Sequence, residues 1–307
     1  MDVFSFFEKF PTELSVIEYF IKVRYADKRG ATCSNCGSVG RTSHRKDTPK
    51  KFQCNSCNNS FSVFKDTIFE KSDTDLRKWF YAIHLMLNSK KGISGYQLQR
   101  EIKVTYKTAW RMLKKIREAM SNEELALFQK ISEIDETYVG GKPRKQAKKD
   151  RDDDDDTPSS GNKRGRGTDK TPVIGIVNRA LNKVVAKVAE LNEQGQKLSG
   201  KQLIAFIKEN VEEGSIICTD EFKGYNGVSR SGFQHRKVDH TREFAVGEIH
   251  TNSIESFWGV LKRGIVGIYH HVSTKYLQLY VNEFAFRWNN REIEDMFGLV
   301  VRRGVLV

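Results

Sequence analysis

Two pairs of cysteines constrain the N-terminal part of this chain more than any other feature. Cys33 and Cys36 form one C-x-x-C pair, Cys54 and Cys57 form another, and 17 residues separate the pairs. Each pair can turn two thiolates toward one ion, and the stretch between them is long enough for a hairpin. Four thiolates leave no open position on the metal, so the spacing predicts a zinc ribbon with structural Zn²⁺. Two disulfides are the disfavoured alternative, because the sequence shows no export signal.

The distribution of charge indicates a polyanionic partner. The 307 residues include 52 Lys and Arg and 39 Asp and Glu, which gives a net charge of +13. Residues 1–130 contain 24 of the basic and 14 of the acidic residues. Under half of the chain therefore carries +10 of the net charge of +13. Nucleic acid is therefore the expected partner, ahead of an acidic membrane surface. Without an apolar run long enough for a membrane span or a secretory signal, we expect a cytoplasmic, nucleoid-associated protein.

A helical segment is predicted after the ribbon. A helix at 75–88, capped by Ser72 or Asp73, precedes a short helix near 96–102 and a longer basic helix at 106–120. Short helix, turn and longer basic helix is the order of a helix-turn-helix. The side chains predicted to contact DNA are Tyr106, Lys107, Arg111, Lys114 and Lys115. An ordinary helical pair with a solvated basic face is the alternative.

From residue 131 the pattern changes to strands. The expected strands lie at 131–139, 172–179, 183–191, 215–219 and 234–239. The expected helices lie near 200–211, 252–264 and 274–290. This order is that of an RNase H-like core, an α/β fold with a mixed sheet and helices on both faces, although several α/β folds share it. The charged stretch 142–170, with five consecutive aspartates, is expected to form a mobile loop.

The sequence thus predicts three regions. An N-terminal helix at 12–25 and the ribbon occupy residues 1–70, and the helix-turn-helix-like region occupies 71–130. The RNase H-like catalytic domain occupies 131–307.

Three acidic residues lie on elements that an RNase H-like fold would bring together. Asp135 is central in the first strand, Asp220 ends the fourth strand, and Glu255 lies in the first closing helix. The first and fourth strands are neighbours in this topology, so we expect the two aspartates side by side with Glu255 over them. Three converging carboxylates repel one another unless cations neutralise them. Two Mg²⁺ or Mn²⁺ ions would do so, and they suit in-line attack on a phosphodiester.

The neighbours of these residues refine the set. Glu136 and Glu221 adjoin the two aspartates, but alternation along a strand turns them to the other face of the sheet. Asn252 lies three residues before Glu255 on the same helical face, and Lys262 lies seven residues after it. Asn252 is expected to supply or orient an oxygen ligand, and Lys262 to hold a phosphate. For any one of these residues alone, an ordinary surface charge would be the better interpretation.

Four segments resemble insertion-sequence transposases of the ISXO2-like group, which combine an N-terminal zinc ribbon with a DDE-type catalytic domain. The matching segments are 134–142 (IDETYVGGK), 219–225 (TDEFKGY), 250–264 (HTNSIESFWGVLKRG) and 283–291 (EFAFRWNNR). The resemblance implies cut-and-paste or a related DNA strand transfer, with Asp135 and Asp220 as the first two metal ligands. The group has either Asn or Glu at the third place, followed by Lys, which Lys262 matches. This sequence has both Asn252 and Glu255, and we favour Glu255 because an anionic oxygen neutralises a cation better than an amide.

The hypothesis from the sequence is therefore a transposase that binds terminal inverted repeats and target DNA as a homodimer or larger synaptic complex. Three alternatives stay open. They are a zinc-ribbon regulator without catalysis, an RNase H-like nuclease or resolvase, and a domesticated transposase that has lost mobility.

Overall fold

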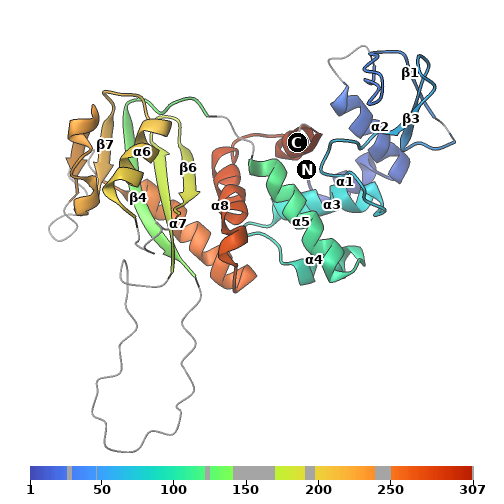
Figure 1. Cartoon of the computed structure of the whole chain (residues 1–307). Coiled ribbons are helices and arrows are strands. Elements are labelled where there is room, and N and C mark those ends of the chain that lie inside the picture. Colours follow the sequence, from blue (N-terminus) through green and yellow to red (C-terminus); the bar gives the residue numbers. More distant parts are fainter. Residues whose placement is uncertain are drawn as a thin grey trace, which may run out of the picture. The chain divides into compact units, whose positions relative to one another are not determined.

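The chain folds into two units, which are drawn in Figure 1. The first unit consists of Met1–Glu123 together with Asn290–Val307, and the second of Glu124–Asn289. The computed structural model describes residues 1–25, 30–45, 47–121, 125–140, 170–190, 198–238 and 250–305. The loop expected at 142–170 lies outside these ranges except for its last residue. Within the described ranges, no helix combines the length and the apolar character needed to cross a membrane.

The first unit contains a small antiparallel sheet and several helices. Its elements are α1 (Val3–Lys9), α2 (Glu13–Arg24), β1 (Thr42–His44), β2 (Lys51–Cys54), β3 (Ser60–Ser62), α3 (Leu76–Asn88), α4 (Gly95–Ile102), α5 (Tyr106–Ser121) and α9 (Met296–Val305). The strands pair in the order β1-β2-β3, with Phe52 opposite Phe61. The sequence pattern did not predict α1 and α9. Phe297 of α9 packs against Phe6, Phe10 and Phe80, so the last helix completes this aromatic core.

The start of α3 differs from the prediction. The cap expected at Ser72 or Asp73 is instead Asp75, whose carboxylate accepts the backbone N–H of Arg77 at 2.7 Å. Ser72 has another role, because its hydroxyl oxygen accepts the indole N–H of the buried Trp79 at 2.9 Å. A buried indole needs such a partner. Because α3 begins at Leu76, Ser72 lies too far before the helix to cap its first turn.

The second unit is built on one five-stranded mixed sheet. Its elements are β4 (Ile131–Val139), β5 (Thr171–Asn178), β6 (Lys183–Val188), α6 (Gly200–Asn210), β7 (Ile216–Thr219), β8 (Gln234–Lys237), α7 (Asn252–Gly264) and α8 (Thr274–Asn289), with short 3₁₀ turns at Lys223–Tyr225 and Ser229–Ser231 and a π turn at Ile265–Tyr269. The strand order is β6-β5-β4-β7-β8. The pairs β4–β5 and β5–β6 are antiparallel, whereas β4–β7 and β7–β8 are parallel. This topology confirms the predicted RNase H-like α/β fold.

Alternation along the strands supplies a separate core on each face of this sheet. On β5, Ile174 and Ile176 pack in the cluster that includes α6, and Val173 and Val177 pack in the cluster that includes α7 and α8. Figure 1 shows these helices on the two faces. Burial of each such side chain contributes about 1.5–3 kcal/mol, so the two faces together fix the sheet between its helices.

Candidate active site

The four paired cysteines converge in the first unit. Their sulfur atoms all lie within 4.8 Å of one another, and all four thiols are free of disulfides. Two of the distances, Cys33 to Cys57 and Cys36 to Cys54, are 3.7 Å. A tetrahedral ion with bonds of about 2.3 Å to sulfur has edges of about 3.8 Å, so the cluster fits Zn²⁺. The hydroxyl and backbone N–H of Ser38 lower the pKa of Cys36 to about 6, which favours the thiolate that a metal needs.

The turn between α4 and α5 presents aromatic and basic side chains. Lys103, in a left-handed conformation, ends α4, and the hydroxyl of Thr105 accepts a backbone N–H from the first turn of α5. Tyr106 then opens α5 and stacks on Tyr96, with 4.4 Å between ring centroids. Both rings are exposed, as is Lys107. The start of α5 therefore offers the kind of surface that can contact nucleic acid.

The other predicted DNA contacts are engaged within the protein. Arg111 donates to the backbone carbonyls of residues 70 and 71, at 3.1 Å and 3.4 Å. Lys114 and Lys115 both pair with Glu118, at 3.1 Å and 2.8 Å. Such partly exposed pairs contribute little to stability and can exchange with solvent or a phosphate. The role of these three residues in DNA binding stays a prediction.

The two aspartates occupy neighbouring strands of the second unit. The parallel register pairs Glu133 of β4 with Cys218 of β7. Two residues farther along each chain lie Asp135 and Asp220, so the register directs both aspartates to the same end of the strand pair. Asp220 follows β7 directly, where its Oδ1 accepts the backbone N–H of Phe222 at 3.0 Å.

Helix α7 supplies the remaining predicted residues. Asn252 is the first residue of the helix, and Glu255 lies in its first turn, where its Oε1 accepts the hydroxyl of Thr251 at 2.8 Å. Lys262, in the last turn, interacts electrostatically with Asp135. Desolvation lowers the pKa of Lys262, and the nearby Asp135 carboxylate opposes that shift.

The environment of Asp135 disfavours its negative charge. Its pKa is raised to about 7, first by burial and then by the charges of Glu136, Asp220 and Glu255. As predicted, Glu136 itself faces the opposite side of the sheet, where it accepts the hydroxyl of Tyr225 at 2.8 Å. A carboxyl whose pKa is raised by neighbouring carboxylates lies at a point where a cation would be stabilised.

A tryptophan and a glycine, neither predicted from the sequence as site residues, restrain Asp135. The indole N–H of Trp258 donates to its Oδ2 at 3.1 Å. Gly175 is the cross-strand partner of Asp135, and a Cβ at this position would lie 2.6 Å from the Trp258 ring. The missing side chain is therefore what allows the indole to lie over β5 and reach the carboxylate. A glycine in the middle of an apolar strand is a signal of such close approach.

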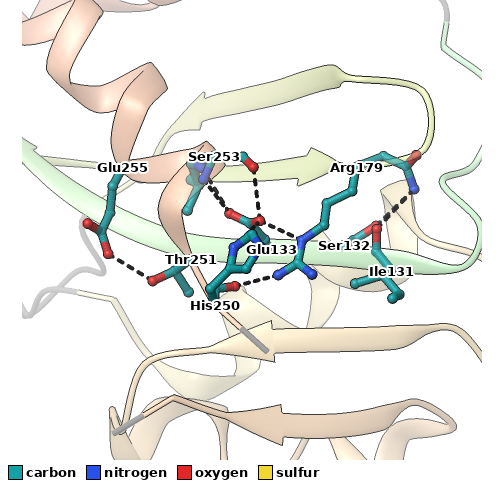
Figure 2. Close-up of polar contacts among 10 residues, drawn as sticks. Ile131, Ser132, Glu133, Arg179, His250, Thr251, Ser253 and Glu255 are labelled. Atoms are coloured by element: carbon teal, nitrogen blue, oxygen red, sulfur yellow. Dashed lines mark hydrogen bonds and ion pairs between the residues drawn. The ribbon is translucent and has the colours of Figure 1, made fainter. Parts of the chain in front are cut away.

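Glu133, on the same strand as Asp135, was not predicted from the sequence. It is fully buried on the face of β4 that carries Asp135, and its Oε1 accepts Nε of Arg179 at 2.6 Å. His250 adds its Nδ1 at 3.1 Å from the same oxygen, and its backbone carbonyl accepts Nη2 of Arg179 at 2.7 Å. Figure 2 shows this cluster beside the start of α7. The sequence did contain a signal for this residue. Glu133 lies two residues before Asp135, so alternation places both on the same face of β4, and a charge that faces the core needs partners.

The predicted ligand set suits a divalent cation. Asp135, Asp220, Glu255 and Asn252 offer oxygen atoms, the donors that Mg²⁺ and Mn²⁺ prefer. In the part of the chain that the structure describes, these carboxylates do not converge within 4.8 Å as the four cysteine sulfurs do. The oxygen set is therefore more open than the cysteine cluster, and its joint role as a ligand set stays a prediction.

Comparison with known proteins identifies related chains. Residues 129–289 match the ISXO2-like transposase domain, and residues 11–60 match a transposase zinc-ribbon domain. An uncharacterised protein in transposable element ISH50 of Halobacterium salinarum is 28% identical over 291 residues, which cover 91% of each chain. An uncharacterised transposase-like protein of Haemophilus influenzae is 31% identical over 98 residues, which cover 32% of this chain and 79% of the relative.

Similarity to solved structures is weaker. The Mos1 transposase paired-end complex with the left transposon end has a TM-score of 0.30 and 10% identity, with 73% of this chain and 78% of that chain covered. The fold is instead established by the strand order and by the domain match.

Proposed function

The chain belongs to the ISXO2-like transposase family, and on that premise we propose that it binds the terminal inverted repeats of its element and catalyses metal-dependent DNA cleavage and strand transfer. The observation that supports the proposal is the parallel pairing of β4 with β7, in which Asp135 and Asp220 each lie two residues beyond the paired residues Glu133 and Cys218. The raised pKa of Asp135 supports it, because strongly perturbed carboxyl groups are concentrated at catalytic sites.

Each residue of the site has a separate role in this proposal. Asp135 and Asp220 hold the divalent cations, and Glu255 completes the set in preference to Asn252. When bound, the cations would supply charge neutralisation and Lewis-acid activation for attack on a phosphodiester. Trp258 restrains the Asp135 carboxylate through its indole N–H, and Lys262 holds a phosphate of the DNA strand.

The first unit is proposed to recognise the ends of the element. Structural Zn²⁺ at the four cysteines would fold the ribbon. Tyr106 and Lys107 lie at the N-terminal end of α5, the part of a recognition helix that contacts base edges. Phosphate contacts from basic side chains would supply most of the affinity and its salt dependence. Because two ends must be joined in one reaction, a homodimer or larger complex is proposed to act at the nucleoid.

Asp135→Asn tests the catalytic proposal. The substrate is a supercoiled plasmid with the two inverted repeats that flank the gene, incubated with zinc-loaded protein and Mg²⁺ or Mn²⁺. The variant is expected to lose cleavage and strand transfer, because an amide cannot neutralise a cation, and to keep end binding within about twofold in a gel-shift assay. Full cleavage by the variant would refute the assignment.

The wild-type protein separates the remaining alternatives in the same assay. Transfer of the cut end into a second plasmid is expected of a transposase and not of a nuclease or resolvase. End binding without cleavage would instead identify a regulator or a domesticated protein.

A further inference from the structure

The carboxylate of Glu133 fastens the first turn of α7 to strand β4. Its Oε2 accepts the backbone N–H of Ser253 at 2.8 Å and that of Ile254 at 3.0 Å, and its Oε1 accepts the hydroxyl of Ser253 at 3.0 Å. The contacts between Glu133 and Ser253 are drawn in Figure 2. Together with the pairing to Arg179, they give a fully buried charge the partners that it needs. An anion at this position also suits the positive end of the helix dipole.

This arrangement replaces the helix's own cap. Thr251 is the N-cap residue of α7, but its side chain makes no capping hydrogen bond. Its hydroxyl instead donates to Oε1 of Glu255 at 2.8 Å. A helix usually satisfies its first N–H groups with the adjacent Ser, Thr, Asp or Asn. Here a side chain from β4 satisfies two of them, so the start of the helix is bonded to another element, and the threonine is available to orient Glu255.

The same strand also carries the first proposed ligand. Glu133 and Asp135 are two residues apart on one face of β4, about 7 Å along a regular strand. From these contacts we propose that Glu133 is a positioning residue, which sets Asn252 and Glu255 at their distance from Asp135 by holding the first turn of α7. Its role toward a metal rests on the proposed function, whereas its role in fixing α7 does not.

Glu133→Gln tests the proposal in the full-length, zinc-loaded protein. The amide keeps the shape of the side chain, but it removes the charge and one acceptor. Glu283→Gln is the matched control, because Glu283 is also fully buried and pairs with Arg287 at 2.9 Å and with Tyr269. Two quantities are measured for each protein. They are the hydrogen exchange of the Ser253 and Ile254 amides without Mg²⁺ or Mn²⁺, and the dissociation constant of Mn²⁺ from electron paramagnetic resonance.

In Glu133→Gln we expect the two amides to exchange at least tenfold faster, with β4 and β5 unchanged, and Mn²⁺ affinity to fall by about 10–100-fold. Glu283→Gln is expected to match the wild type within twofold in both measurements. Wild-type values in Glu133→Gln, or equal losses in both variants, would overturn the proposal.

A milder variant covers the case in which Glu133→Gln does not fold. Ser253→Ala removes one of the three α7 donors to Glu133, so Mn²⁺ affinity should fall by a factor of about three, whereas an unchanged affinity would overturn the positioning role. If the wild type itself does not bind Mn²⁺, the proposed function fails. Faster exchange in Glu133→Gln would then still support the attachment of α7.

Discussion

Ionisation of Asp135 makes the metal-free protein less stable as pH rises. Its pKa is raised from the usual 3.8 to about 7 by burial and by three neighbouring carboxylates. A carboxyl whose folded pKa is raised makes its full contribution to stability below its unfolded pKa, and this contribution is lost progressively as pH rises from the unfolded pKa through the folded pKa. Asp135→Asn cannot ionise and is spared this loss. The variant is therefore expected to be more stable than the wild type at neutral and alkaline pH.

The size of the effect follows from the same shift. At about 1.4 kcal/mol for each pKa unit, the variant should gain about 4 kcal/mol in free energy of unfolding at pH 8 and about 2 kcal/mol at pH 5. Asp135 is only partly buried, and solvent screening is expected to reduce both values, by up to about half. The wild type should still lose stability relative to the variant between pH 5 and pH 8.

Urea unfolding of zinc-loaded protein without Mg²⁺ or Mn²⁺ measures this difference. The indole N–H resonance of Trp258 is a suitable probe, because this group donates to the Asp135 carboxylate at 3.1 Å. In the folded wild type the resonance should also shift with pH, with a midpoint near 7, and saturating Mg²⁺ should lower that midpoint. A wild-type midpoint below about pH 5, or equal stability of the two proteins at pH 8, would refute the reasoning.

Three further predictions concern other parts of the chain. Cys54→Ser should remove one zinc ligand, so that amide protection in β1–β3 is lost in hydrogen exchange while that of β4 and β5 is kept; full protection of the ribbon would contradict the zinc assignment. Gly175→Ala places a methyl group against Trp258, so we expect a loss of about 1–3 kcal/mol in thermal unfolding and weaker cleavage, and an unchanged Trp258 resonance would argue against the contact. Tyr106→Ala removes the exposed ring that stacks on Tyr96, and the affinity for the inverted repeats in a gel shift should fall by about tenfold while a Tyr96→Phe control binds normally.

The ribbon and the sheet were predictable because their patterns are local. The C-x-x-C spacing predicted the ribbon, and the helix at 106–120 is observed at Tyr106–Ser121. The strand at 131–139 is observed with the same bounds, Ile131–Val139. Alternation within that strand correctly separated Asp135 from Glu136.

What the sequence did not reveal depends on contacts between distant segments. Glu133 becomes a buried partner of α7 only when the chain brings Ser253 back to β4, 120 residues later. Helix α9 is short and contains two glycines, so its pattern is weak by itself. Its place is set by contacts such as the backbone N–H of Ile68 with the carbonyl of Gly304 at 3.0 Å. The cap of α3 was misplaced because the helix begins at Leu76, which makes Asp75 its N-cap residue.

The return of the last helix to the first unit has a consequence for synthesis of the chain. The aromatic core formed by Phe6, Phe10 and Phe80 is complete only when Phe297 has been made. The second unit is thus inserted into the first, with both of its ends joined to it. A ribosome-bound chain that stops before α9 therefore exposes this core. The first unit, which is proposed to bind DNA, therefore reaches full stability only after the whole second unit, which is proposed to cut DNA, has been synthesised.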